Sequence, residues 1–110
     1  MDWAHCISYF FGGICLCNAI PHFVSGVMGR PFQSPFAKPP GKGLSSSVVN
    51  VLWGFFNLCV AYLLLVCVGD FDLHCGAHMA ALGAGLLLMA LLSARQFGRF
   101  HGGNAPGTPR

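Results

Sequence analysis

Two polar side chains, Asn18 and His22, stand one helical turn apart near the end of the first apolar stretch of the chain. The second apolar stretch carries Asn50, Trp53 and Asn57 at spacings of three and four, which places them on one stripe of a helix. An imidazole exchanges protons near neutral pH, an amide offers a donor and an acceptor, and an indole adds a flat wall with one donor. If the two stretches are neighbouring helices, these groups can form a pocket for a neutral or anionic lipid-like head group or a quinone-like carbonyl.

The depth of these residues supports the same grouping. A rise of about 1.5 Å per residue puts Asn50 near the depth of His22 and Asn57 nearer the middle of a membrane. Arg30 and the Pro-rich segment after it would close the space from one side. Two interpretations stay open, because amides and imidazoles also serve as hydrogen-bond partners between membrane helices. The candidate ligand-binding residues are Asn18, His22, Arg30, Asn50, Trp53 and Asn57.

A second group of candidate ligands lies at the opposite ends of the same stretches. His74 and His78 are four residues apart, Asp70 and Asp72 precede them, and His5 belongs to the same level. Imidazole and carboxylate groups bind transition metals, and two His at this spacing can share one ion. The set matches no complete metal-binding spacing, so the simpler interpretation is that these side chains face water.

The six cysteines define no disulfide framework, because their spacing contains no recognisable pattern. Three lie within apolar stretches, and three lie near one face, where two can pair in an oxidising compartment. The first three are Cys15, Cys17 and Cys59, and the others are Cys6, Cys67 and Cys75. The sequence also lacks a nucleophile motif, a phosphate-binding loop and a carboxylate pair, so we expect no catalytic residue and no cofactor.

The composition requires that the elements carrying these residues lie in lipid. Hydrophobic residues make up 55% of the 110 residues and charged residues only 8%, against about 25% charged residues in soluble domains. The apolar stretches predict an all-α integral membrane fold with three transmembrane helices, each able to cross a hydrocarbon core of about 30 Å. The three helices form one domain, residues 1–95, and we expect them at about 3–28, 47–68 and 75–94. A Pro/Gly-rich cytoplasmic loop at 29–46 joins the first two helices, and a disordered cytoplasmic tail at 96–110 follows the domain.

Local signals mark the ends and faces of these helices. Pro21 predicts a kink in the first helix, and the serines at 45–47 offer N-cap oxygens to the second. The Pro-rich loop either lies on the membrane, folds back onto the helices or forms a solvated linker. The third helix carries two rows of small residues, which allow close helix packing in lipid. One row is Gly76, Ala80 and Ala84, and the other is Ala77, Ala81 and Gly85.

The charges predict how the chain is oriented. All Lys and Arg residues fall in the loop and the tail, whereas the three Asp residues fall on the other side of a three-span arrangement. Basic residues stay in the cytoplasm, so we expect a multi-pass protein with its N-terminus outside and its C-terminus inside. The net charge of +3 comes from juxtamembrane residues, and no clustered basic face predicts nucleic-acid binding. The basic residues are Arg30, Lys38, Lys42, Arg95, Arg99 and Arg110.

Four motifs give the chain a family resemblance. They are Asn-Ala-Ile-Pro-His-Phe at 18–23, Gly-Arg-Pro-Phe at 29–32, Ser-Pro-Phe-Ala at 34–37 and Asn-Val-Leu-Trp-Gly-Phe-Phe-Asn at 50–57. Over roughly residues 9 to 62, the chain resembles a family of small uncharacterised bacterial membrane proteins. The resemblance implies a bacterial inner (plasma) membrane and no particular activity.

Three functions follow from these patterns, in order of preference. The first is a non-enzymatic assembly or interaction module that forms a homo-oligomer or joins a larger membrane complex in contact with membrane lipid. The alternative is binding or transport of a small hydrophobic or lipid-like ligand at the Asn/His/Trp pocket of the inner leaflet. The third is a membrane enzyme using His22 as general acid or base, for which a second catalytic group is missing. No carboxylate lies deep in a span, which argues against a conventional cation or proton transporter.

Overall fold

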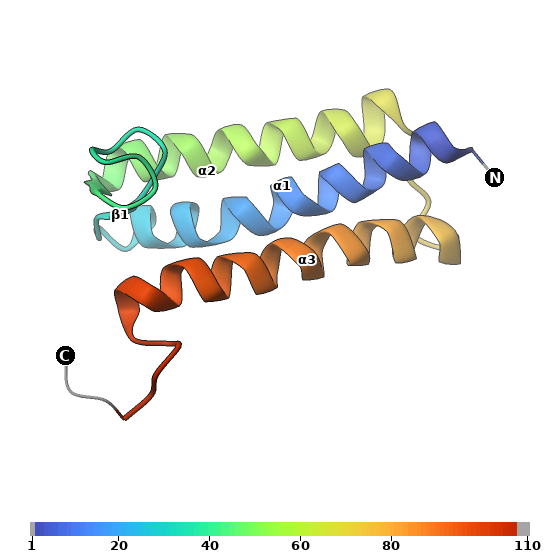
Figure 1. The fold of residues 1–110 in the computed structure, drawn as a ribbon. Coiled ribbons are helices and arrows are strands. Elements are labelled where there is room, and N and C mark those ends of the chain that lie inside the picture. Colours follow the sequence, from blue (N-terminus) through green and yellow to red (C-terminus); the bar gives the residue numbers. More distant parts are fainter. Residues whose placement is uncertain (1, 108–110) are drawn as a thin grey trace.

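The computed structural model describes residues 2–107, and this part of the chain folds into three long helices joined by a Pro-rich loop and a short turn (Figure 1). All three helices are long and apolar enough to cross a membrane. The all-helical prediction is therefore confirmed. The elements are α1 (Trp3–Val27), β1 (Phe32–Gln33), β2 (Leu44–Ser45), α2 (Ser47–Tyr62), the π-helical η1 (Leu63–Val68) and α3 (Gly76–His101).

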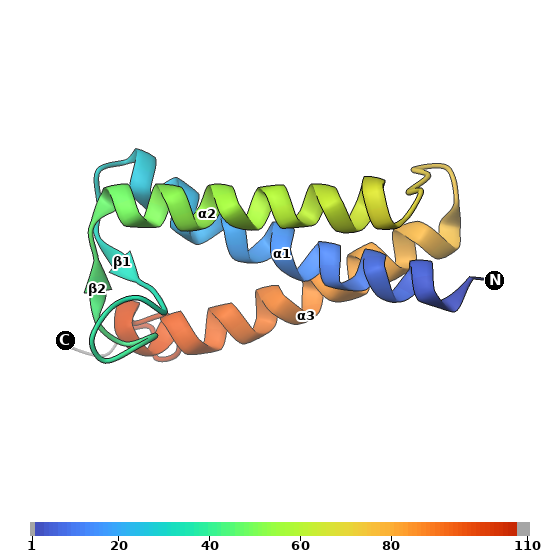
Figure 2. The ribbon, with the colours of Figure 1, turned by 90° about the horizontal axis from the view of Figure 1, so that it is seen from above.

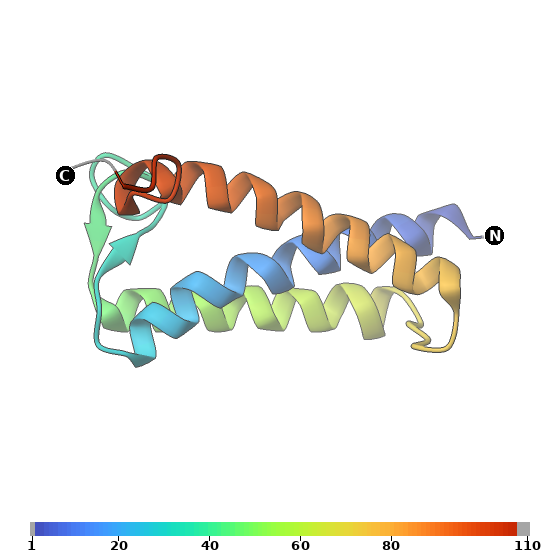
Figure 3. The same cartoon turned by 90° about the horizontal axis from the view of Figure 1, so that it is seen from below.

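The first helix occupies the centre of the molecule. α1 packs against both α2 and α3, and Figures 1 and 3 show it between them along most of its length. α2 and α3 diverge toward one end, where the antiparallel pair β1–β2 closes the space between them (Figure 2). The N-terminus and the turn between η1 and α3 lie at the other end (Figure 1).

Side-chain caps and a glycine explain where the helices begin and end. Asp2 Oδ1 accepts the backbone N–H groups of Ala4 at 3.1 Å and His5 at 3.3 Å, so α1 begins directly after it. Ser46 Oγ accepts the N–H of Val49 at 3.2 Å, which confirms the predicted serine cap of α2. α3 ends at His101, and the next residue, Gly102, caps it with a φ of 82°, the left-handed conformation that glycine favours.

The third helix is longer than the sequence predicts. It continues past Ala94 for about two turns to His101, because Phe97 and His101 pack on the Pro-rich loop. The predicted disorder is therefore wrong for residues 96–101, and turns follow through residue 107. Arg110 and the end of the predicted tail lie outside the described residues. α1 continues as a helix through Pro21, and the kink stays a prediction.

Glycines allow α1 and α3 to approach closely. A Cβ on Gly85 would collide with the backbone carbonyl of Phe10, and a Cβ on Gly13 would collide with that of Leu82. Of the two predicted small-residue rows, the one that ends at Gly85 faces α1, whereas the other is exposed. One row therefore packs this chain together, and the other stays available to another helix.

The burial pattern is the reverse of that in a water-soluble protein. The buried polar side chains include His22, Asn50 and Asn57, while large apolar side chains such as Leu52, Phe55 and others along all three helices are exposed. Apolar surface in such amounts is costly in water and favourable in lipid. The described fold thus fits a multi-pass membrane protein.

Candidate functional site

Asn50, in α2, contacts α1 and the Pro-rich loop at the basic end of the molecule. Its side chain is fully buried, and its amide nitrogen donates to the carbonyl oxygens of Phe32, Ser45 and Ser46 at 3.2, 3.2 and 3.0 Å. Its Oδ1 lies 2.8 Å from Nδ1 of His22, which is only 2% exposed. His22 and Asn50, which helix spacing placed at a similar depth, are therefore in direct contact. The amide of Asn50 also holds the loop against α2.

The second pair, Asn18 and Asn57, lies deeper in the bundle than His22 and Asn50. Asn18 donates from Nδ2 to Oδ1 of Asn57 at 3.1 Å. Asn57 donates in turn to the backbone carbonyl of Trp53 at 2.9 Å. The structure thus joins the four amide and imidazole side chains in two bonded pairs, as expected from helix spacing.

A cavity of about 140 Å³ lies beside these pairs, and we call it the polar cavity because most of the residues that line it have polar side chains, although much of its surface is apolar. α1 contributes Asn18 and His22 to its wall, α2 contributes Trp53, and the rest comes from the loop and from α3. This volume can hold several water molecules or a small head group. The remaining lining residues are Gln33, Ser34, Pro35, Gly41, Gln96 and Phe97.

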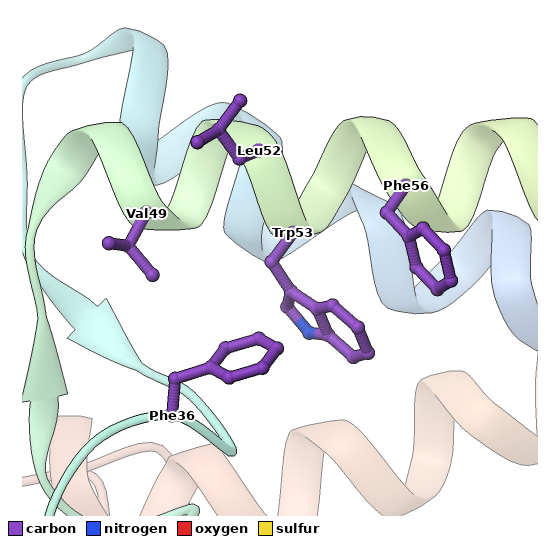
Figure 4. A pocket seen from close by; sticks show the side chains of 5 residues that line it. All are labelled: Phe36, Val49, Leu52, Trp53 and Phe56. Atoms are coloured by element: carbon purple, nitrogen blue, oxygen red, sulfur yellow. The ribbon is translucent and has the colours of Figure 1, made fainter.

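An apolar groove of about 520 Å³ lies on the other side of Trp53. Figure 4 shows its wall, formed by Phe36 of the loop together with Val49, Leu52, Trp53 and Phe56 of α2. The indole Nε1 is buried without a hydrogen-bond partner in the described chain, and it lies on the edge of the ring nearest Phe36 (Figure 4). The rings of Phe36 and Trp53 are nearly perpendicular, with centroids 5.1 Å apart, an arrangement that favours an N–H contact with an aromatic face.

The Pro-rich loop folds back onto the helices, which is one of the three arrangements considered from the sequence. Phe32 packs edge-on against His22 and stacks on His101, with ring centroids at 5.5 and 5.2 Å. Gln33 Oε1 lies 3.0 Å from Nε2 of His101, and Ser34 is hydrogen-bonded to Ser45. The loop therefore forms one wall of the cavity.

Arg30 is not part of this site. Gly29, with a φ of 73°, turns the chain at the end of α1, and Arg30 donates its backbone N–H to Ser25 at 2.9 Å. Arg30 is exposed and does not line the cavity. The cavity is closed on this side by uncharged residues of the Pro-rich loop, namely Gln33, Ser34, Pro35 and Gly41.

The expected metal ligands are used in separate local contacts. His5 pairs with Asp2 at 3.2 Å, and His74 lies 3.7 Å from Asp72. His78 Nδ1 accepts the backbone N–H of Asp72 at 3.0 Å. Within residues 2–107, no three His, Cys, Asp or Glu side chains are grouped so that they could hold one ion. Asp70 offers its backbone N–H to the hydroxyl of Tyr9 at 2.8 Å.

Several residues of the site have no counterpart in the sequence-based prediction. Gln33 and Ser34 are among them, because helix periodicity predicts the positions of helical residues and says nothing about how a loop folds. Gln96 and Phe97 lie beyond the predicted end of the third helix. The spacing of Phe97 and His101, one helical turn, is the signal that could have extended that helix.

Comparison with protein-family models, with curated proteins and with solved structures gives no match to this chain.

Proposed function

We propose that the chain is a bacterial inner-membrane protein that binds one lipid-like amphiphile at the inner end of its bundle. The observation that carries the proposal is the position of Trp53, which is a wall of both the polar cavity and the apolar groove. An amphiphile needs such a pair of neighbouring spaces, one for its head and one for its tail.

The membrane setting rests on the surface and on the charges. The three helices expose apolar side chains throughout. The loop and the last turns of α3 carry the basic residues, while Asp70 and Asp72 belong to the turn between η1 and α3. Figure 1 shows these segments at opposite ends of the molecule. The positive-inside tendency then puts the loop in the cytoplasm and the N-terminus outside. The resemblance of the sequence motifs supports a bacterial membrane.

The groove lies on the lipid-facing side of α2, where Leu52 and Phe56 are exposed. A chain can therefore enter sideways from the inner leaflet, and its head can reach the cavity past Trp53. The hydrogen bonds of Asn50 and Asn57 keep the cavity wall in place without the ligand. A wall formed in advance lowers the ordering cost of binding.

The test uses the two tryptophans of the chain. In the full chain with Trp3→Phe, Trp53 is the only indole, and Trp3→Phe changes an exposed residue at the opposite end of α1. The protein is placed in lipid nanodiscs and titrated with a series of single-chain amphiphiles that share one brominated acyl chain. Bromine quenches a nearby indole, so we expect quenching that saturates at low mole fraction and is reversed by the same amphiphile without bromine.

The matched control is the full chain with Trp53→Phe, in which Trp3 is the reporter. Its quenching should rise in proportion to the bromine present, because Trp3 contacts bulk lipid only. If Trp53 follows the same proportional curve with every head group in the series, the binding proposal fails.

A second proposal, assembly of several copies, is favoured by the exposed small-residue row of α3. Gly76 and Gly83 have open space where a Cβ would be, and Ala80 and Ala84 are exposed beside them. Ala80→Leu should therefore reduce cross-linking between copies in native membranes without unfolding the monomer. Met79→Leu is the control, since Met79 is exposed but lies off this row. Unchanged cross-linking in Ala80→Leu would argue against assembly through α3.

A further inference from the structure

We infer that the polar cavity takes an uncharged head group carrying two hydroxyl donors, such as a glycerol esterified once. The inference rests on the proposed function, and it follows from where the hydrogen bonds on the cavity wall leave unused acceptors. Two such acceptors, on Asn18 and His22, lie one turn apart on α1.

The first acceptor is Nε2 of His22. The Nδ2 group of Asn50 faces three backbone carbonyls, so the amide cannot be turned over without placing its oxygen against them. Oδ1 of Asn50 is therefore the atom beside His22 Nδ1, and Nδ1 must carry the proton. In the neutral imidazole, Nε2 is then an acceptor. It has no hydrogen-bond partner in the described chain, and His22 lines the cavity.

The second acceptor is Oδ1 of Asn18. Asn57 donates Nδ2 to the carbonyl of Trp53, which leaves its Oδ1 facing Asn18. Asn18 must therefore present Nδ2 to that oxygen, and its own Oδ1 is left without a partner within residues 2–107. Side chains one turn apart have Cβ atoms about 5 to 6 Å apart. Two neighbouring hydroxyls of one head group can therefore serve both acceptors.

The charges around the cavity exclude ionic head groups. None of its lining residues is Lys, Arg, Asp or Glu, so neither a phosphate nor an ammonium group would find a counter-ion there. A charge moved into such a site without a partner loses its hydration at high cost. An uncharged diol needs only the two acceptors.

The experiment compares head groups on one brominated acyl chain, using the Trp3→Phe protein in nanodiscs. The probes are a monoacylglycerol, its dimethyl ether, a lysophosphatidic acid and an acylcholine. Methylation removes both donors and leaves the protein unchanged. Two lost hydrogen bonds at about 1 kcal/mol each should weaken binding of the dimethyl ether at least tenfold.

Asn18→Leu provides a second measurement. It should weaken the monoacylglycerol several-fold more than the dimethyl ether, provided that circular dichroism gives the same helix content as the parent. Equal binding of the diol and its dimethyl ether would overturn the inference while leaving amphiphile binding intact. Tighter binding of the phosphate or the choline probe would also overturn it. If no probe gives saturable quenching, the proposed function itself fails.

Discussion

A single amide, that of Asn50, fastens the loop, α1 and α2 to one another. It is buried, and its two amide hydrogens are shared among three carbonyl oxygens in addition to its contact with His22. In lipid no water can replace Asn50 as the partner of these buried groups, so removing its side chain should be costly. Asn57, seven residues further along α2, makes one donated bond and one accepted bond, and both join it to α1 or α2.

Asn50→Leu should lower the free energy of unfolding by about 2 to 3 kcal/mol, because several buried groups lose their partner. It should also speed tryptic cleavage after Lys42, since the loop loses its attachment. Denaturation in detergent micelles and a digestion time course measure both effects. Asn57→Leu is the matched control: it should cost about 1 kcal/mol, as other hydrogen bonds between membrane helices do, with no change in cleavage. Equal cleavage in the two variants would contradict the role of Asn50 in holding the loop.

At the opposite end, Tyr9 secures the turn before α3. Its ring is fully buried against Phe71 and His78, with ring centroids at 5.3 and 4.5 Å, and its hydroxyl accepts the N–H of Asp70. Tyr9→Phe keeps the ring and should cost about 1 kcal/mol of unfolding free energy. Tyr62→Phe, at an exposed position of α2, should cost nothing measurable. The same denaturation assay compares them, and a neutral Tyr9→Phe would show that this hydrogen bond contributes no stability.

Helix periodicity predicts part of the site and misses the rest for physical reasons. The faces and depths of Asn18, His22, Asn50 and Asn57 follow from the pitch and rise of a helix, and the structure pairs them. The position of Arg30 depends on how Gly29 turns the chain, which no period describes. The contribution of α3 depends on a loop that packs on Phe97 and so extends the helix. A local turn accounts for the first difference, and a contact between segments far apart in sequence accounts for the second.

The glycines of α3 differ sharply in what surrounds them, although they look alike in sequence. Gly85 packs against the backbone of α1, whereas Gly83 has open space around it. Gly85→Ala should lower the unfolding free energy by about 2 kcal/mol, because the helices must move apart to admit a methyl group. Gly83→Ala should be neutral or stabilising by up to about 1 kcal/mol, as expected of alanine in a helix. Thermal unfolding of the pair in micelles tests this, and similar melting temperatures would contradict close packing at Gly85.

The molecule as a whole separates its charges between its two ends. Of the described residues, the Asp residues belong to the N-terminus and to the turn between η1 and α3, and the Lys and Arg residues belong to the Pro-rich loop and the last turns of α3. Figure 1 shows these two sets of segments at opposite ends of the molecule. The same separation follows from the sequence, because three spans put the loop and the tail on one side. The candidate metal site does not share this support, because within residues 2–107 no three of its side chains are grouped so that they could hold one ion.

A topology measurement follows from this arrangement. A reporter active only outside the cytoplasm should work when fused to the N-terminus and fail at the C-terminus, and a cytoplasmic reporter should give the opposite result. Changing Lys38, Lys42 and Arg30 to Gln should weaken this bias by removing half of the basic residues. Finding both ends in one compartment would contradict three spans, and the residues that line the cavity would then not lie at a common depth in the membrane.

The central position of α1 also has a consequence for biosynthesis. The helix made first is the one that both later helices pack against, while the later two diverge from each other. Each newly inserted segment therefore finds its docking surface already in the bilayer, and no earlier contact has to be broken to admit it. Folding in the order of translation is built into the arrangement of this bundle.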